Sequence, residues 1–198
     1  MSDTAAAGDW AILVGQIEKG NARETDNRST VEAARDGDQE AFKQLYDSYA
    51  PLVHGILLAR APLPEVDDLV QEVFATAFRR MHTLRDSGSF GGWIATIARN
   101  RAVDALRRLR ETREAREELV EGRPASVNID SDARARKIVE VIRELPEAYS
   151  ETLLLRLVEG MTGPEIARRT GLTPASVRVN LHRGMKLLRE RLVEEGLA

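Results

Sequence analysis

The sequence predicts an all-α protein made of two small helical domains joined by a flexible linker. Apolar residues recur at helical spacing in several segments, whereas long β-branched runs are absent and Gly and Pro are modest. A charged, weakly periodic stretch, residues 113–135, separates two groups of such segments. A helix-turn-helix pattern over residues 162–192 follows in the second group.

Composition limits the classes of protein that this chain resembles. The chain has 198 residues, of which 42% are apolar and 31% charged, as in compact helical units with charged surfaces. No apolar stretch approaches the ~20 residues that span a bilayer. The N-terminus lacks the basic start and apolar core of a signal peptide, and the absence of cysteine excludes disulfides and thiolate metal sites. We therefore expect a cytoplasmic protein.

The net charge of −3 hides a strong asymmetry along the chain. Residues 1–78 carry 14 acidic and 6 basic residues, whereas residues 79–116 carry ten arginines and four acids. Residues 117–147 are again acidic, and residues 148–198 are mildly basic. Clustered arginines favour contact with a polyanion, because phosphate contacts depend on local charge.

Residues 1–30 are expected to form an N-terminal extension with a short amphipathic helix. Trp10, Leu13, Val14 and Ile17 form one stripe over residues 9–19, and a polar stretch follows. The stripe is interpreted either as a loosely docked tail or as a surface that packs on the rest of the chain or on a partner.

The first domain is assigned to residues 31–112. A helix over residues 38–60 is expected to be interrupted or bent at Pro51. The segment APLPEV indicates a loop, and residues 65–80 form the clearest amphipathic helix. Its inward positions are Val66, Leu69, Val70, Val73, Phe74 and Ala77.

The outward face of this helix is acidic. Glu65, Asp68 and Glu72 align on it, with Asp67 and Gln71 beside them. Carboxylates at this spacing repel one another, so their presence calls for a reason. A metal site is one possible reason, but the helix has no histidine and no second acidic helix is near in sequence. A docking surface for a basic partner is favoured over a metal site, and a merely solvated face stays open.

A Ser- and Gly-rich loop, LRDSGSFGG, then leads into a helix over residues 93–110. This helix carries more arginines than can be buried, next to the aromatic residues at the exit of the loop. Aromatic rings beside cationic side chains suit single-stranded nucleic acid, whose bases stack on them for ~1–3 kcal/mol each. The alternative is core aromatics with a solvated arginine face.

The second domain is assigned to residues 136–194. A helix starts at Leu145-Pro146 and ends at Gly160, with Tyr149, Leu153 and Leu157 inward. In the helix-turn-helix, Gly171 provides the turn, where positive φ is easily adopted, and Thr173-Pro174 provides an N-cap followed by proline. The buried face of the last helix is expected to comprise Val177, Leu181, Gly184, Leu188 and Leu192.

Another side of this last helix is polar and basic. Its residues are Ser176, Arg178, Val179, His182, Arg183 and Lys186. Such side chains near a helix N-terminus reach base edges and phosphates in a major groove. A solvated basic face is the alternative.

Several motifs together resemble the extracytoplasmic function (ECF) group of bacterial RNA polymerase sigma factors, which contain only regions 2 and 4. These motifs are AFKQLYDSYAPLV, DDLVQEVFATAFRR, F-x-x-WIATIARNRAVDALRR, LPEAYSETLLLRLVEGMTGPEIARRTG and SVRVNLHRGMKLLRERL. The resemblance covers nearly everything outside the first thirty residues and the linker. DDLVQEVF followed by W-I-x-x-IARN is its specific part.

The resemblance implies partners and residue roles. Core RNA polymerase would bind through its β′ coiled coil and β flap, with Asp67, Asp68, Gln71 and Glu72 on the β′ coiled coil. The −10 promoter element would contact Asp86, Ser87, Ser89, Phe90, Trp93, Arg99, Asn100, Arg101, Asp104 and Arg107, with residues 86–90 around a flipped base. The −35 element would contact Ser176, Arg178, Val179, His182, Arg183 and Lys186. An anti-sigma factor is the implied regulator, and no cofactor, metal or small-molecule substrate is implied.

Three departures from the family pattern stand out. Gly91-Gly92 replaces bulkier polar residues and is expected to loosen the −10 loop. Val179 replaces a frequent Ser or Thr and suits a thymine methyl, and Asn180 removes a frequent positive charge.

Two other functions are compatible with parts of this sequence. A free-standing transcriptional regulator would contain a similar helix-turn-helix. The motifs DDLVQEVF and IARN, and the lack of a phosphate-accepting α/β domain, argue against this function. An enzyme using Asp67, Asp68 and Glu72 lacks a nucleophile–base pair, a phosphate loop and a His-rich ligand set.

Overall fold

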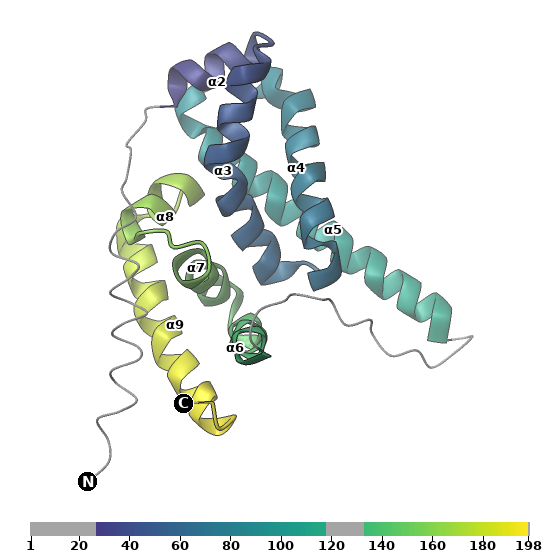
Figure 1. Cartoon of the computed structure of the whole chain (residues 1–198), viewed down its shortest axis with the longest axis vertical. Coiled ribbons are helices and arrows are strands. Elements are labelled where there is room, and N and C mark those ends of the chain that lie inside the picture. The colour runs from purple at the N-terminus through teal and green to yellow at the C-terminus, as the bar shows by residue number, and fades with distance from the viewer. Residues whose placement is uncertain (1–26, 118–132, 198) are drawn as a thin grey trace.

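The computed structural model describes residues 27–117 and 133–197, and all regular structure in these ranges is helical (Figure 1). The all-α prediction is therefore confirmed. The amphipathic segment expected over residues 9–19 and most of the expected linker lie outside the described residues. None of the helices in the two described ranges has the length and apolarity that a membrane crossing requires.

The first unit comprises four helices and three short 3-10 turns. The helices are α2 (Arg28–Arg35), α3 (Gln39–Arg60), α4 (Val66–Arg80) and α5 (Phe90–Glu117). The turns are η2 (Leu63–Glu65), η3 (Met81–Thr83) and η4 (Ser87–Ser89). The second unit comprises α6 (Ala133–Glu144), α7 (Glu147–Leu157), α8 (Gly163–Thr170) and α9 (Pro174–Glu194).

In the first unit, α3, α4 and α5 pack around one apolar core. All six inward positions expected on α4 are buried, which confirms the pattern. Phe42, Tyr46, Phe74 and Phe78 form a line of ring contacts between α3 and α4, with centroids 4.5–6.4 Å apart. The helix α3 runs without interruption through Pro51, so the expected interruption is wrong, and a bend at Pro51 stays a prediction.

The helix α5 begins earlier and ends later than the sequence predicts. It starts at Phe90, includes Gly91 and Gly92, and continues to Glu117. The expected loosening by the two glycines is not seen, because both lie inside the first turn of a regular helix. The first five residues of the expected linker are likewise helical.

The second unit carries the predicted helix-turn-helix, and its local signals work as expected. Gly171 ends α8 with φ of 77°. The Thr173 side chain accepts a hydrogen bond from the Ser176 amide at 3.1 Å and caps α9. Val177, Gly184, Leu188 and Leu192 are buried and Leu181 is half-buried, which confirms the inward face of α9.

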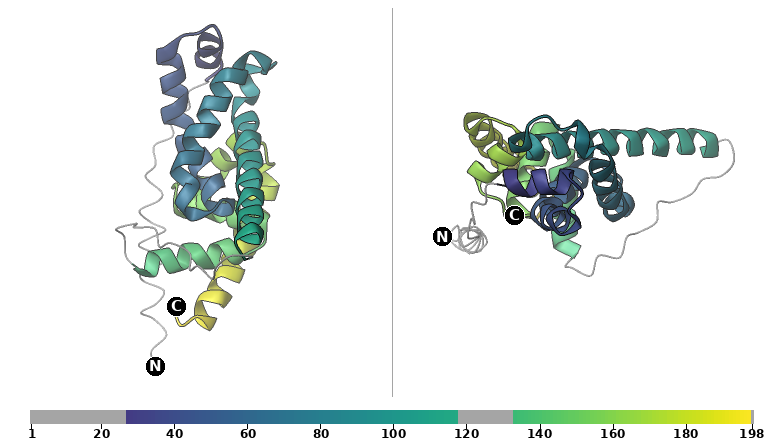
Figure 2. Two further views of the ribbon diagram at one scale, coloured as in Figure 1. Left: turned by 90° about the vertical axis from the view of Figure 1, so that its right-hand side faces the viewer. Right: turned by 90° about the horizontal axis from the view of Figure 1, so that it is seen from above.

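The two units lie directly against each other. The helix α7 packs across α3, and α8 packs against α5, in all three views (Figures 1 and 2). Leu155, Met161, Ile166, Ala167 and Val177 of the second unit belong to the same buried cluster as the core of the first unit. The apolar core is thus continuous across the boundary between the units.

Candidate nucleic-acid and polymerase interfaces

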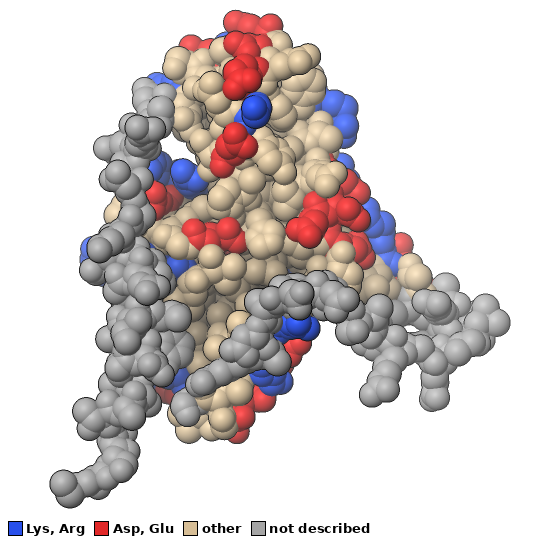
Figure 3. All heavy atoms as spheres, in the orientation of Figure 1, with Lys and Arg blue, Asp and Glu red and all other residues tan. Residues whose placement is uncertain are grey.

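The acidic residues of α4 lie together on its solvent face. Asp67, Asp68, Gln71 and Glu72 are all exposed. Figure 3 shows acidic side chains gathered over this part of the molecule, next to Lys and Arg side chains on the α5 side. Two long-range ion pairs at 3.8 Å connect this region with α5: Glu72 of α4 with Arg101, and Glu65, the last residue of η2, with Arg108. The face is therefore available to a basic partner, and its edge is already paired with α5.

A cavity of about 570 Å³ opens beside this face. Asp67, Val70 and Gln71 line it from α4, Tyr46, Asp47, Ala50, Pro51 and His54 from α3, and Glu159 from the turn after α7. Its acidic lining favours cationic groups. In residues 27–117 and 133–197, no three His, Asp or Glu side chains are grouped closely enough to hold a metal ion.

The expected base-capturing loop is the short turn η4. Asp86 caps it by accepting hydrogen bonds from the Gly88 amide at 3.0 Å and the Ser89 hydroxyl at 2.6 Å. The Ser89 hydrogen bond, with the Gly88 amide and the charge of Arg28, holds the pKa of Asp86 below its ordinary value. Ser87 donates to Glu32 of α2 at 3.2 Å. The turn is therefore built to keep a charged carboxylate at the surface.

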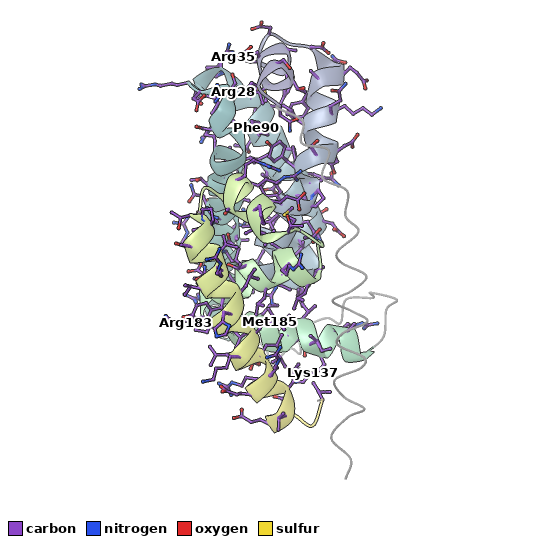
Figure 4. All side chains as sticks on the ribbon, turned by 90° about the vertical axis from the view of Figure 1, so that its left-hand side faces the viewer. Arg28, Arg35, Phe90, Lys137, Arg183 and Met185 are labelled. Carbon is purple, nitrogen blue, oxygen red and sulfur yellow. The ribbon has the colours of Figure 1, made fainter. Side chains whose placement is uncertain are left out.

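Phe90, which was expected beside a flipped base, is buried beneath the turn. Its ring is 1% exposed and packs edge-on against Tyr49, with centroids 4.9 Å apart. Figure 4 places it among the helices of the first unit. Trp93 is half-buried and lies against the Phe90 ring at 5.7 Å. In this conformation Phe90 supports the turn from inside. The exposed residues of the turn are Asp86, Gly88 and Ser89.

The expected −10 residues of α5 fall on different sides of the helix. Asn100 and Arg107 are exposed, whereas Arg101 and Asp104 are half-buried. Arg101 also donates to the Thr76 hydroxyl at 3.1 Å, and Arg107 pairs with Asp104 at 3.5 Å. Arg99 lies on the side of α5 that faces the second unit and forms an ion pair with Glu151 of α7 at 2.7 Å.

The expected −35 residues share the outer side of α9. Arg178, Val179, His182, Arg183 and Lys186 are exposed, and Ser176 is half-buried. Arg183 lies on this outer side in Figure 4. The 44% exposed Val179 side chain offers an apolar contact within a basic surface. Asn180 turns inward instead and donates to the Thr152 hydroxyl of α7 at 3.4 Å.

Sequence reasoning missed the charged residues that lie between the two units. Glu151, Arg60, Arg143, Arg169, His54 and Glu159 all contact the opposite unit. The one available signal is that Glu151 lies four residues before the buried Leu155, on an otherwise apolar stripe of α7. A charge on such a stripe indicates a buried partner.

An acidic helix face, an arginine-rich helix and a capped helix-turn-helix define a two-unit helical DNA-binding protein. Family comparison agrees: residues 45–112 match Sigma-70 region 2, and residues 135–188 match Sigma-70 region 4. RNA polymerase sigma factor CarQ of Myxococcus xanthus is 32% identical over 169 residues, covering 83% of this chain and 96% of CarQ. ECF RNA polymerase sigma factor RpoE of Cereibacter sphaeroides is 29% identical over 198 residues, covering 97% and 99%.

Solved structures share the fold. CnrH in complex with the cytosolic domain of CnrY has a TM-score of 0.59 at 25% identity, covering 85% of this chain and 97% of that chain. RpoE of Bartonella quintana in complex with the anti-sigma factor NepR has a TM-score of 0.54 at 20% identity, covering 76% and 96%. The chain belongs to the ECF group of RNA polymerase sigma factors, which direct polymerase to promoters.

Proposed function

We propose that this sigma factor binds core polymerase through the exposed face of α4 and reads two promoter elements with α5 and α9. The carrying observation is that Asp67, Asp68, Gln71 and Glu72 form one solvent-exposed face although their charges repel. Such a face is stabilised by a basic partner, which the family resemblance identifies as the β′ coiled coil. The β flap is the proposed partner of the second unit.

The promoter contacts are assigned by position and charge. Asp86, Ser87, Ser89, Trp93, Asn100, Arg101, Asp104 and Arg107 are proposed to hold the opened −10 strand, together with Arg99 once it leaves Glu151. Phe90 supports the turn from inside. The exposed side of α9 enters the major groove at the −35 element, where Arg183 reads a base edge and Val179 contacts a thymine methyl.

Control by an anti-sigma factor is part of this proposal. It rests on the resemblance and on the similar structures, of which RpoE is solved with the anti-sigma factor NepR and CnrH with the cytosolic domain of CnrY. The protein would act in the cytoplasm, where polymerase and promoter DNA meet.

Charge reversal tests the α4 assignment. The double variant Asp68→Lys/Glu72→Lys should lose core binding, because two repulsive contacts replace two attractive ones, while its helical circular dichroism is kept. Native gel shift with core polymerase and run-off transcription on a genomic promoter library measure the effect. Asp36→Lys/Glu40→Lys is the matched control, since both residues are exposed acids away from α4. Undiminished core binding by the α4 variant would contradict the assignment.

A further inference from the structure

The short helix α2 packs on the turn η4, which is the proposed loop around the flipped base. Val31 and Ala34 anchor α2 in the apolar core of the first unit, with 1% and 3% of their surfaces exposed. Glu32 accepts a hydrogen bond from the Ser87 hydroxyl at 3.2 Å and ties the helix to the turn. Because α2 precedes residues 45–112, which match Sigma-70 region 2, its role does not follow from that match.

Arg28, the first residue of α2, lies directly over Gly88 of this turn. A Cβ at Gly88 would lie 2.8 Å from Nη2, 3.0 Å from Nε and 3.1 Å from Cζ of Arg28. These atoms belong to one planar guanidinium group, so a side chain at position 88 would displace it. Arg28 is exposed, and Figure 4 places it at the same end of the molecule as Phe90, the residue after the turn. The guanidinium group therefore lies at the surface of the turn, within reach of a ligand bound there.

The turn presents a negative charge to any nucleic acid that approaches it. The Ser89 hydroxyl and the Gly88 amide hold the pKa of Asp86 below its ordinary value, and the charge of Arg28 adds to this. Asp86 is exposed, so its carboxylate repels the phosphates of a strand at the turn. A cation beside the carboxylate offsets this repulsion, and Arg28 is placed to do so.

The arginines already assigned to the −10 strand serve a different part of it. They belong to α5, and their partners lie on α4, α5 and α7. These contacts are Arg101 with Thr76, Arg107 with Asp104 and Arg99 with Glu151. A strand that follows α5 therefore meets them beyond the turn, whereas a nucleotide at η4 lies beside α2.

From these contacts we infer that α2 completes the −10 site, with Arg28 binding a backbone phosphate of the nucleotide held at η4. The inference rests on the proposed function, which places the opened −10 strand at this turn. A planar guanidinium group donates two parallel hydrogen bonds to a phosphate, which fixes the position of that nucleotide. Phosphate contacts set the register while base contacts give specificity, so Arg28 aligns the base with Asp86 and Ser89.

Binding of the opened strand to holoenzyme tests the role of Arg28. The probe is the single non-template strand across the −10 element of a promoter found by the run-off assay, and fluorescence anisotropy measures its affinity. Arg28→Ala should weaken binding about fivefold at 0.1 M salt and lower the slope of log K against log salt concentration by about 0.7, the contribution of one phosphate contact on a single strand. Arg28→Lys should keep most of the slope, because the charge remains.

Arg35 provides the matched control on the same helix. It is exposed and lies two helical turns further on, about 10 Å along the helix axis, which is roughly one Debye length at 0.1 M salt. Arg35→Ala removes the same charge and should leave binding within about twofold of the unsubstituted protein. Equal losses in the two alanine variants would mean that α2 contributes only general charge, and would overturn the inference.

Neutral linkages locate the contact on the DNA. A methylphosphonate replaces one phosphate of the strand at a time, and the unsubstituted holoenzyme should lose about fivefold in affinity at the phosphate that Arg28 binds. At that position Arg28→Ala should lose nothing further, because both changes remove the same interaction. If every neutral linkage weakens Arg28→Ala as much as it weakens the unsubstituted holoenzyme, Arg28 binds no phosphate and the inference is overturned.

Gly88→Ala tests the placement of the arginine without removing its charge. The added Cβ meets the end of a flexible side chain, so the guanidinium group moves and the turn keeps its backbone. Binding should fall as in Arg28→Ala, and the double variant should bind no more weakly than either single variant. Additive losses would show that the two residues act independently, which contradicts the inference.

Failure of the inference and failure of the proposed function give different results. If the unsubstituted holoenzyme does not bind the strand, the assignment of the −10 strand to this surface is wrong, and the inference falls with it. If the strand binds, and Arg28→Ala binds it equally well with an unchanged salt slope, the proposed function stands and α2 is not part of the −10 site.

Discussion

Arg183 is the side chain on which −35 recognition is expected to depend most. It is exposed on the outer side of α9, one helical turn beyond Val179 (Figure 4). Arg183→Ala should weaken promoter use by about 1–3 kcal/mol, roughly 5–150-fold, because an arginine bound to a guanine edge contributes that much. Run-off transcription from a promoter with an intact −35 element measures the loss.

A second arginine of the same helix serves as the control. Arg191 is exposed two turns further on and pairs with Glu194 at 3.4 Å. Arg191→Ala should leave promoter use within twofold of the unsubstituted protein, an estimate based on the small contribution of exposed ion pairs, about 0–1 kcal/mol. Equal losses in the two variants would mean that α9 contributes general charge and that Arg183 reads no base.

Burial decides the role of single residues that sequence pattern treats alike. Phe90 and Trp93 are both aromatic residues beside the proposed −10 loop, yet Phe90 is 1% exposed and Trp93 is half-buried. Arg99 and Asn100 are neighbours in the same motif, but Arg99 binds Glu151 and Asn100 faces solvent. The motif therefore identified the segment, and the packing of neighbouring helices assigned each side chain its surroundings.

At the scale of elements, α8 depends on a reciprocal cap. Its first residue follows Thr162, whose hydroxyl accepts from the Glu165 amide, while the Glu165 carboxylate accepts from the Thr162 amide at 2.8 Å. Thr162→Ala should destabilise the protein by about 1 kcal/mol, because the Glu165 amide at the helix start loses its hydroxyl acceptor. Urea unfolding followed by circular dichroism measures the change in midpoint.

Thr112→Ala is a suitable comparison for this substitution. Thr112 is exposed near the end of α5, and its hydroxyl donates only to the Arg108 carbonyl of the same helix at 2.8 Å. Alanine favours helix more than threonine does, so the midpoint should stay or rise slightly. A drop in stability as large as that of Thr162→Ala would show that the cap itself contributes little.

Helix boundaries followed from tertiary contacts more than from local signals. Pro51 leaves the Asp47 carbonyl without its helical amide, but Asp47 is exposed and lines an open cavity, so water can satisfy that carbonyl and α3 continues. Gly91 and Gly92 suggested a loop, yet α8 packs on the start of α5 and makes this turn helical. Packing therefore overruled propensity at the two glycines, whereas at Pro51 solvation of the unpaired carbonyl lets the helix continue.

For the molecule as a whole, two titrating contacts make the packing between the two units depend on pH. The hydrogen bond with Glu159, at 2.6 Å, raises the pKa of His54 above its ordinary 6.5; burial opposes this, and the charges of Glu159 and Asp67 add to it. Asp47 of α3 lines the same cavity. A raised pKa favours the protonated form when the two units are in contact, so this contribution to the contact is complete below pH 6.5 and is lost as the pH rises through the raised value.

Glu151 acts in the opposite direction. Its contacts with Arg99 and Arg60 hold its pKa below the ordinary 4.5, so its contribution is present above pH 4.5 and is lost as the pH falls through the lowered value. The chain has no cysteine, so dyes on His82→Cys and Glu194→Cys, both exposed, report the distance between the two units by energy transfer. The transfer should be highest at mildly acidic pH, between these two limits. It should decline on both the alkaline and the acid side.

A single substitution distinguishes the alkaline decline in energy transfer from the acid decline. His54→Gln keeps a hydrogen-bonding side chain but cannot become charged, so the alkaline decline should disappear while the acid decline remains. The measurement is energy transfer from pH 4 to 9. An alkaline decline that persists in His54→Gln would assign the effect to another group.

The architecture was largely predictable, whereas the arrangement of the units was not. The all-α class, the inward face of α4 and the helix-turn-helix with its Gly171 turn follow from periodicity and caps, which are local properties of the chain. Helical periodicity within α9 likewise predicted that the −35 residues share one exposed side. The −10 residues were split between faces, because α7 and α8, distant in sequence, pack beside them.

The sequence by itself determined the family, the order of the helices and the side chains available for polymerase and DNA. Each of these depends on spacing within one helix or on motifs that are contiguous in the chain. Only the tertiary structure decided that Glu151 is buried between Arg60 and Arg99, and that α8 rests on Gly91. These contacts join residues more than fifty positions apart, so their geometry arises from how the two apolar cores meet, which no local pattern encodes.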